Sequence, residues 1–149
     1  HTVSFPIRKT ADHPLRMEAV TDFDSSFSPE SATGTSSEND AATLLSAVTH
    51  YQILYNSPDL SVITLKLDTG RTHQIRVHMK ALGHPLLGDT LYQEILSSDF
   101  SLGQPDFKRT ALHAWKTRFR HPFNNAWISL EAPLPDDFCN CFQNIDFSL

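Results

Sequence analysis

The sequence predicts an α+β domain with a mostly antiparallel sheet and flanking helices. Short stretches rich in Val, Ile, Thr and Tyr come in consecutive pairs, and a segment with helical character follows each pair. Antiparallel strand pairs followed by separate helices are typical of this class. The 149 residues suit one domain. In chain order, we expect strands at 45–55, 60–67, 110–121 and 126–130, and helices at 72–82 and 136–147.

The N-terminal third of the chain has weaker signals of regular structure. Residues 1–20 predict one or two short extended pieces, broken by Pro6 and Pro14. Residues 22–43 are rich in Ser, Thr, Asp, Glu and Ala and have too little apolar content to order themselves. We therefore expect a flexible insertion at 22–43 within a single domain at 1–149.

The central segment predicts a hairpin followed by a helix with two different faces. The turn sequence at 56–59 separates the two strands. Gly83 is expected to end the helix at 72–82. At 100° per residue, one helix face is apolar and should pack on the core, whereas the opposite edge is basic. The apolar face holds Ile75, Met79 and Leu82, and the basic edge holds His73, Arg76 and Lys80.

Charge is distributed unevenly along the chain. The formal net charge is −5, from 12 basic and 17 acidic residues. Residues 60–125 hold nine of the twelve Lys and Arg residues but only five of the seventeen Asp and Glu residues. Charges beyond about 8–10 Å are screened at physiological salt, so a basic middle can bind a polyanion although the whole chain is acidic. This composition excludes a uniformly basic protein.

Several other classes of protein and site are disfavoured by the residue types present. The two cysteines, Cys139 and Cys141, are too few for a disulfide framework or a four-cysteine zinc site. The longest apolar runs are far shorter than the roughly 20 residues of a membrane-spanning helix. His73 and His78 are five residues apart and so point about 140° away from each other on a helix. We therefore expect no metal site.

The most specific feature is the stretch at 65–92, LKLDTGRTHQIRVHMKALGHPLLGDTLY. It closely resembles the signature of the RluA-type pseudouridine synthases. The later sequences ALHAWKTRFRHPF at 111–123 and EAPLPDDF at 131–138 resemble downstream segments of that family. FPIR at 5–8 and the strand at 46–55 fit the family's order, so the resemblance extends over about residues 2–138.

The resemblance implies that the protein isomerises uridine to pseudouridine in ribosomal or transfer RNA, in the cytoplasm and without a cofactor or metal. Arg76 matches the family arginine that pairs with the catalytic Asp, and Leu112 matches an apolar residue that lines the uracil pocket. Asp89 matches a position that we interpret as structural. The residues implied to contact RNA are Arg71, Thr72, His73, Gln74 and Lys80. For Arg71 and His73 the alternative role is to cap the preceding loop and the helix start.

The family's catalytic Asp belongs to an H-R-L-D motif, and no such motif occurs in these 149 residues. The family's upstream Tyr motif is missing as well. We therefore expect a C-terminal portion of a catalytic domain that is inactive alone and self-associates through an exposed sheet edge. One alternative is a catalytically inactive RNA-binding paralogue, and another is a small hydrolase that uses the His-rich middle. Beside Arg76 we expect an anion, water or a substitute acidic side chain, unless Arg76 is a purely structural residue paired within the chain.

Overall fold

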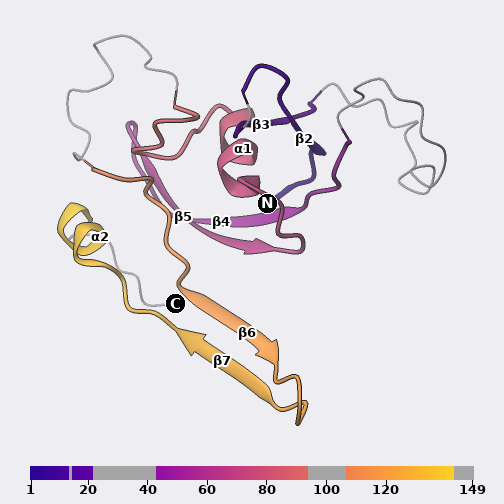
Figure 1. Cartoon of the computed structure of the whole chain (residues 1–149). Coiled ribbons are helices and arrows are strands. Elements are labelled where there is room, and N and C mark those ends of the chain that lie inside the picture. Colours follow the sequence, from indigo (N-terminus) through magenta and orange to yellow (C-terminus); the bar gives the residue numbers. More distant parts are fainter. Residues whose placement is uncertain (14, 22–42, 94–106, 143–149) are drawn as a thin grey trace, which may run out of the picture.

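The computed structural model describes residues 1–13, 15–21, 43–93 and 107–142, and it confirms the expected α+β class. A three-stranded antiparallel sheet has the order β1-β4-β5, and two further strand pairs, β2-β3 and β6-β7, lie apart from it. Figure 1 shows α1 packed over this sheet, with the β2-β3 pair beside it. The strands are β1 (Thr2–Val3), β2 (Ile7–Lys9), β3 (Met17–Ala19), β4 (Thr49–Asn56), β5 (Ser61–Leu67), β6 (Lys116–Arg120) and β7 (Trp127–Glu131). The helices are α1 (Gln74–Ala81) and α2 (Asp136–Cys141).

The predicted central hairpin is confirmed as the β4-β5 pair. Its register places Tyr51 opposite Leu65 and Ile53 opposite Ile63, so β-branched and aromatic side chains share one face. The strand begins at Thr49 and not at residue 45, because Leu45 instead forms an isolated bridge with Ile7 through two backbone hydrogen bonds of 2.8 and 2.9 Å.

The predicted core face of α1 is wrong in two of its three positions. Ile75 and Leu82 are only partly buried, while Gln74, Val77 and His78 are buried together with the expected Met79. The reason is that Gln74 and His78 reach polar partners below the helix. Buried polar groups are tolerated where they are hydrogen-bonded, and apolar periodicity alone does not detect them.

A network centred on Thr49 joins the helix to the sheet. Gln74 Nε2 donates to Val48 O (2.9 Å) and to Thr49 Oγ1 (3.0 Å). The His78 ring bonds Thr49 Oγ1 through Nδ1 and Phe5 O through Nε2, each at 2.9 Å. Because a carbonyl only accepts, Nε2 carries the proton and Nδ1 is the acceptor. Burial lowers the pKa of His78, which keeps this neutral form.

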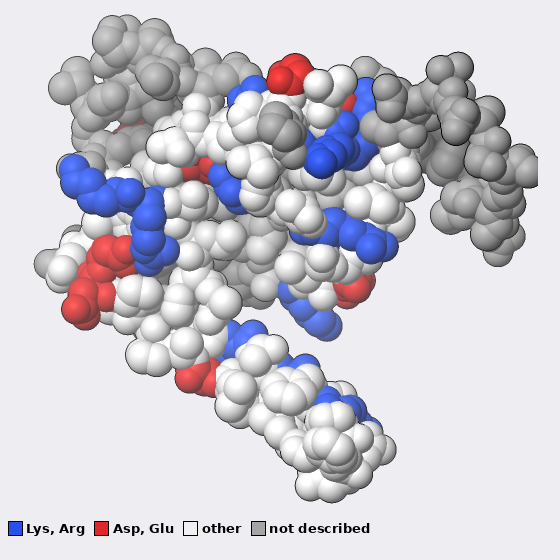
Figure 2. Space-filling model, in the orientation of Figure 1, with Lys and Arg blue, Asp and Glu red and all other residues white. Residues whose placement is uncertain are grey.

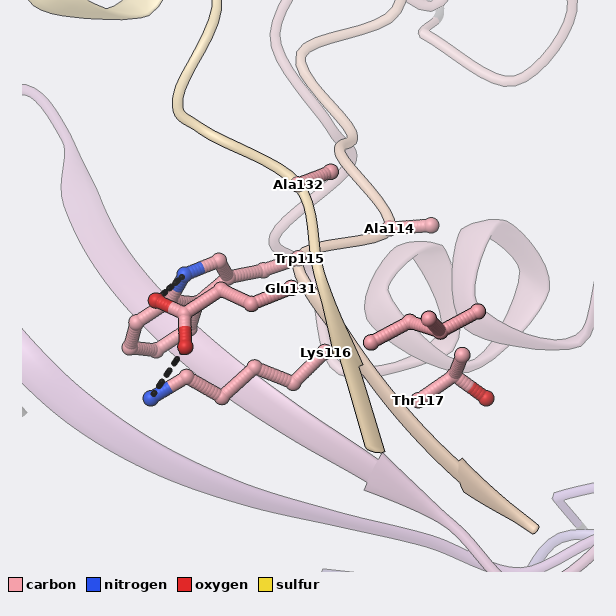
Figure 3. A pocket seen from close by; sticks show the side chains of 7 residues that line it. Ala114, Trp115, Lys116, Thr117, Glu131 and Ala132 are labelled. Carbon is pink, nitrogen blue, oxygen red and sulfur yellow. Dashed lines mark hydrogen bonds and ion pairs between the residues drawn. The ribbon is translucent and has the colours of Figure 1, made fainter. Parts of the chain in front are cut away.

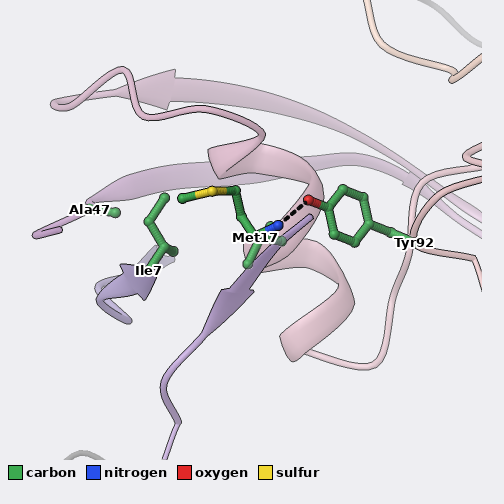
Figure 4. Close-up of a cluster of buried hydrophobic side chains, with 5 residues drawn as sticks. Ile7, Met17, Ala47 and Tyr92 are labelled. Atoms are coloured by element: carbon green, nitrogen blue, oxygen red, sulfur yellow. Dashed lines mark hydrogen bonds between the residues drawn. The ribbon is translucent and has the colours of Figure 1, made fainter. Parts of the chain in front are cut away.

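The hydrophobic core lies between α1 and the β2-β3 pair (Figure 4). The Tyr92 ring is 2% exposed, and its hydroxyl accepts a 2.9 Å hydrogen bond from the Met17 backbone N–H. Tyr92 is therefore a core residue with a satisfied polar end. The buried members of this cluster are Ile7, Met17, Ala47, Val77 and Tyr92.

The C-terminal part of the chain forms a hairpin and a short helix. The β6-β7 hairpin projects away from the sheet and helix α1, as Figure 1 shows. Its first strand begins at Lys116 and not at residue 110, since the segment from Phe107 to Leu112 packs against another turn, described below. Helix α2 starts at residue 136 as expected. The helix ends at Cys141 with Phe142 as its C-cap, so the predicted continuation of the helix through residue 142 is wrong. The predicted insertion at 22–43, except for Thr43, and residues 143–147 lie outside the described residues.

Candidate active site

The centre of the candidate site is an ion pair between helix α1 and the turn that follows it. Arg76 Nε donates to Asp89 Oδ2 (2.7 Å), and Arg76 Nη2 donates to Asp89 Oδ1 (2.6 Å). The Asp89 side chain is fully buried, whereas that of Arg76 is 20% exposed. An acidic side chain of this chain thus stands beside Arg76, which agrees both with the expected substitute for the catalytic Asp and with the structural alternative of a pair within the chain. It belongs to the residue that we interpreted as structural.

Hydrogen bonding keeps Asp89 ionised in spite of its burial. Burial is the largest single influence and would raise the pKa of this carboxyl, but the hydrogen bonds and charge of Arg76 together with two backbone hydrogen bonds lower the pKa below its usual value. The backbone N–H groups of Leu91 and Tyr92 act in the same direction, each donating to Oδ1 at 3.2 Å. Asp89 in turn raises the pKa of Arg76. The pair therefore holds a guanidinium with one fixed orientation at the protein surface.

An aromatic side chain supports the same guanidinium. Arg76 Cζ lies 4.8 Å from the centroid of the Tyr92 ring, within the range of a cation–π contact. The Tyr92 hydroxyl, which accepts from Met17, lies 2.9 Å from His73 Nδ1. Burial, followed by the charge of Arg76, lowers the pKa of His73. The neutral ring then accepts a hydrogen bond from the Tyr92 hydroxyl at Nδ1.

The turn that carries Asp89 depends on a glycine. Gly88 has φ +70°, and a Cβ at this position would overlap the Arg109 carbonyl oxygen and lie 2.8 Å from that of Phe107. Close approach of one backbone to another requires glycine here. The Ala111 N–H also donates to Leu87 O (2.8 Å). The segment 107–112 is therefore held against the turn that positions the Arg76 partner.

Leu112 belongs to this segment. It is partly buried, and its carbonyl accepts a 3.0 Å hydrogen bond from Arg109 Nη1. Its placement next to the turn at 87–89 follows from the Ala111–Leu87 bond one residue earlier. A role of Leu112 in lining a base pocket stays a prediction.

The five residues predicted to contact RNA differ in how far they are exposed to solvent. Arg71 and Thr72 are exposed, His73 and Lys80 are partly buried, and Gln74 is 2% exposed. The Gln74 amide is occupied by internal partners, which also include the Arg71 backbone N–H at 3.0 Å. The geometry therefore disfavours contact between RNA and Gln74, while the other four side chains stay predictions.

The structure supports only in part the alternative role of Arg71 and His73, which was to cap the preceding loop and the helix start. His73 is the N-cap residue of α1 with φ 55°, but its side chain makes no capping bond. Arg71 Nε instead donates to Ser46 O (3.1 Å), which ties the loop to the chain before β4. The Gln74 side chain, together with Thr69, holds the helix start.

Within the described residues, no group of three or more His, Cys, Asp and Glu side chains could hold a metal ion, and no helix is long and apolar enough to cross a membrane.

Comparison with known proteins gives concordant similarities. Residues 5–81 match the family model described as RNA pseudouridylate synthase. The chain is 48% identical over 98 residues to the ribosomal large subunit pseudouridine synthase D of Haemophilus influenzae, which covers 62% of this chain and 30% of that protein. It is 37% identical over 141 residues to the uncharacterized RNA pseudouridine synthase YhcT of Bacillus subtilis, which covers 93% of this chain and 37% of that protein.

A solved structure is similar as well. The human RNA pseudouridylate synthase domain containing 1 superposes with a TM-score of 0.60 at 30% identity, covering 91% of this chain and 48% of that one. The chain thus spans about a third of the length of these two relatives and about half of that structure.

Proposed function

Because the chain belongs to the RNA pseudouridylate synthase family, and within it to the RluA type, we propose that the whole protein isomerises uridine to pseudouridine in RNA. This chain supplies the C-terminal portion of the catalytic domain. The observation that carries the proposal is the Arg76 guanidinium, which Asp89 and Tyr92 hold rigidly at the position that the family signature assigns to the partner of the catalytic Asp.

The proposed reaction exchanges one bond to the ribose for another. The N1–C1′ bond breaks, the base turns, and a C5–C1′ bond forms while the proton on C5 is lost and N1 gains one. Substrate and product contain the same atoms in the same overall oxidation state, so we propose no cofactor. The protein has to position a carboxylate at C1′ or on the base and stabilise charge there.

Arg76 is suited to hold that carboxylate. A guanidinium has five N–H donors, and the pair with Asp89 uses only Nε and one hydrogen of Nη2. Within the described residues Nη1 makes no hydrogen bond, so it is available to a second carboxylate from the H-R-L-D segment of the whole domain. Charge-assisted bonds of this kind are short and directional. Leu112 is proposed to form an apolar wall for the uracil.

The substrate and the compartment follow from the same proposal. The first relative is named for the ribosomal large subunit, which supports ribosomal RNA over transfer RNA as the substrate. We propose that the protein acts in the cytoplasm on this RNA. Arg71, Thr72, His73 and Lys80 form the proposed contact surface at the start and along one edge of α1.

The second candidate function is that of a catalytically inactive paralogue, which binds RNA without isomerising it. Self-association through an exposed sheet edge would accompany either function, because an unpaired strand edge favours pairing with another chain.

Tritium release from RNA labelled at C5 of uridine tests the proposal. The 149-residue chain alone should release none, and a chimera should restore release when the part of the Haemophilus relative that lies upstream of the matched segment precedes it. Arg76→Lys in the chimera keeps the charge but loses the planar fork, so it should lower the rate by orders of magnitude while RNA binding persists. Turnover by the pure chain that depends on one of its own Asp residues would contradict the assignment. A folded chimera that binds RNA without turnover would favour the binding function.

A further inference from the structure

The β6-β7 hairpin has two chemically different faces. Its register pairs Lys116 with Glu131, Arg118 with Ser129 and Arg120 with Trp127. Directly opposed residues of an antiparallel pair point to the same side, and successive residues alternate. One face is therefore basic with an exposed indole. The other face is largely apolar and holds Thr117, Phe119, Ile128 and Leu130.

The basic face is organised around Trp127, whose side chain is 52% exposed. The guanidinium carbons of Arg118 and Arg120 each lie 4.2 Å from the centroid of its ring. Arg120 Nη1 also donates to Asn125 O at 2.9 Å, which ties it to the hairpin turn. Two guanidiniums thus lie over one indole ring on the two-stranded hairpin.

This face has a local excess of positive charge. Its one carboxylate, Glu131, lies at the base of the hairpin, where it accepts from Trp115 Nε1 at 3.0 Å and pairs with Lys116 Nζ at 3.6 Å. Figure 3 shows these three side chains together, with Thr117 on the opposite side of the strand. Neither Arg118 nor Arg120 has a carboxylate partner within the described residues.

The surface view supports the same distribution. On the face shown in Figure 2, basic atoms follow one edge of the projecting hairpin, and acidic atoms near the hairpin are seen only at its base. Arg118 and Arg120 are two residues apart on one strand, which corresponds to about 7 Å. An anion with repeated charges and flat rings fits this arrangement better than a single small anion does.

We propose that the Arg118–Arg120–Trp127 face of the β6-β7 hairpin is an RNA-binding surface that takes a single-stranded stretch of RNA. The inference rests on the proposed function, because RNA is the polyanion that a protein of this activity binds. Arginines donate to phosphate oxygens, and an unpaired base can stack on the plane of a guanidinium or on the part of the indole that the arginines leave exposed. Duplex RNA fits less well, since its bases are not free to stack on a side chain.

The position of the hairpin places this contact outside the Arg76 site. Strand β6 follows the segment 107–112, which is held against the Gly88–Asp89 turn. From Leu112 to Arg118 the chain spans at most about 20 Å. The hairpin would then hold nucleotides that flank the target uridine, and it would contribute affinity without touching the reacting base.

Fluorescence titration of the 149-residue chain with a single-stranded RNA of about 12 nucleotides tests the inference. Arg118→Gln and Arg120→Gln should each reduce the slope of log affinity against log salt by about 0.7, the value expected for one lost phosphate contact on a single strand. Trp127→Leu should weaken binding about tenfold, in the range of a lost base stack, and leave the salt slope unchanged. In a Trp115→Phe background, RNA should quench the fluorescence of Trp127.

Matched controls separate this surface from the general charge and from the proposed active site. Arg8→Gln removes an equal charge from strand β2, where Arg8 pairs with Glu18 at 2.6 Å, and it should leave the affinity nearly unchanged. Circular dichroism melts of each variant exclude unfolding as the cause of lost binding. If Arg71→Gln weakens binding while the hairpin variants bind as the wild type does, the inference fails and the proposed function stands. The inference also fails if inorganic polyphosphate binds as tightly as RNA and quenches no fluorescence, or if the wild-type chain binds no RNA. In either case the tritium-release assay tests the proposed function separately.

Discussion

Replacing Arg76 by Ala should strongly destabilise the described part of the chain. The substitution leaves the Asp89 carboxylate, which is fully buried, without its cationic partner. Loss of one member of a buried pair costs about 3–5 kcal/mol, because an uncompensated charge stays in the interior. Two backbone N–H groups still donate to Asp89, so we expect a value near the lower limit, about 3 kcal/mol. For a domain of this size, the melting temperature should fall by about 6–12 °C.

Urea unfolding at pH 7 and at pH 4.5 measures this effect and its cause. Without Arg76, burial is the dominant influence on Asp89 and raises the pKa of its carboxyl above the unfolded value. The carboxyl then takes up a proton as the pH falls, which removes the buried charge. The stability difference between Arg76→Ala and the wild type should therefore narrow at pH 4.5.

Arg109 provides a control, because its ion pair has a similar geometry to that of Arg76 but is more exposed to solvent. Arg109 donates to Asp137 through Nε (2.7 Å) and Nη2 (2.9 Å), but both side chains are about 40% exposed. Surface pairs contribute little, so Arg109→Ala should change the unfolding midpoint far less than Arg76→Ala. Equal losses for the two variants, or a loss at Arg76 that does not depend on pH, would refute the account based on a buried carboxylate.

Two further predictions concern the turn after α1 and the buried histidine. Gly83 and Gly88 both have positive φ, but open space surrounds a Cβ at Gly83, whereas backbone oxygens occupy that space at Gly88. In urea unfolding, Gly83→Ala should cost about 1–2 kcal/mol and Gly88→Ala clearly more; equal costs would contradict the close approach of segment 107–109. The pKa of His78 is lowered in the folded chain, so its contribution to stability is complete above about pH 6.5 and is lost as the pH falls through the lower, folded value. His78→Gln should lower stability at pH 7.5 and reduce its loss between pH 7 and pH 5, and an unchanged pH dependence would show that another group titrates.

The sequence by itself determined the features that depend on local patterns. The paired β-rich stretches and the turn at 56–59 predicted the β4-β5 hairpin, because strand propensity and turn chemistry are properties of neighbouring residues. The stretch at 65–92 was specific enough to indicate the family. It also indicated Arg76 as a candidate site residue, and that role stays a prediction.

Only the tertiary structure decided which partners the polar residues have. Gln74 and His78 are polar residues of the kind that usually occupies an exposed helix face, yet both are buried. Gln74 bonds to Thr49, and His78 bonds to the carbonyl of Phe5, which is 73 residues away. The pair of Arg76 with Asp89 likewise depends on a turn held by a distant backbone segment. Periodicity predicts which side chains share a face, but the burial of a polar group depends on hydrogen-bond partners that the chain brings together only on folding.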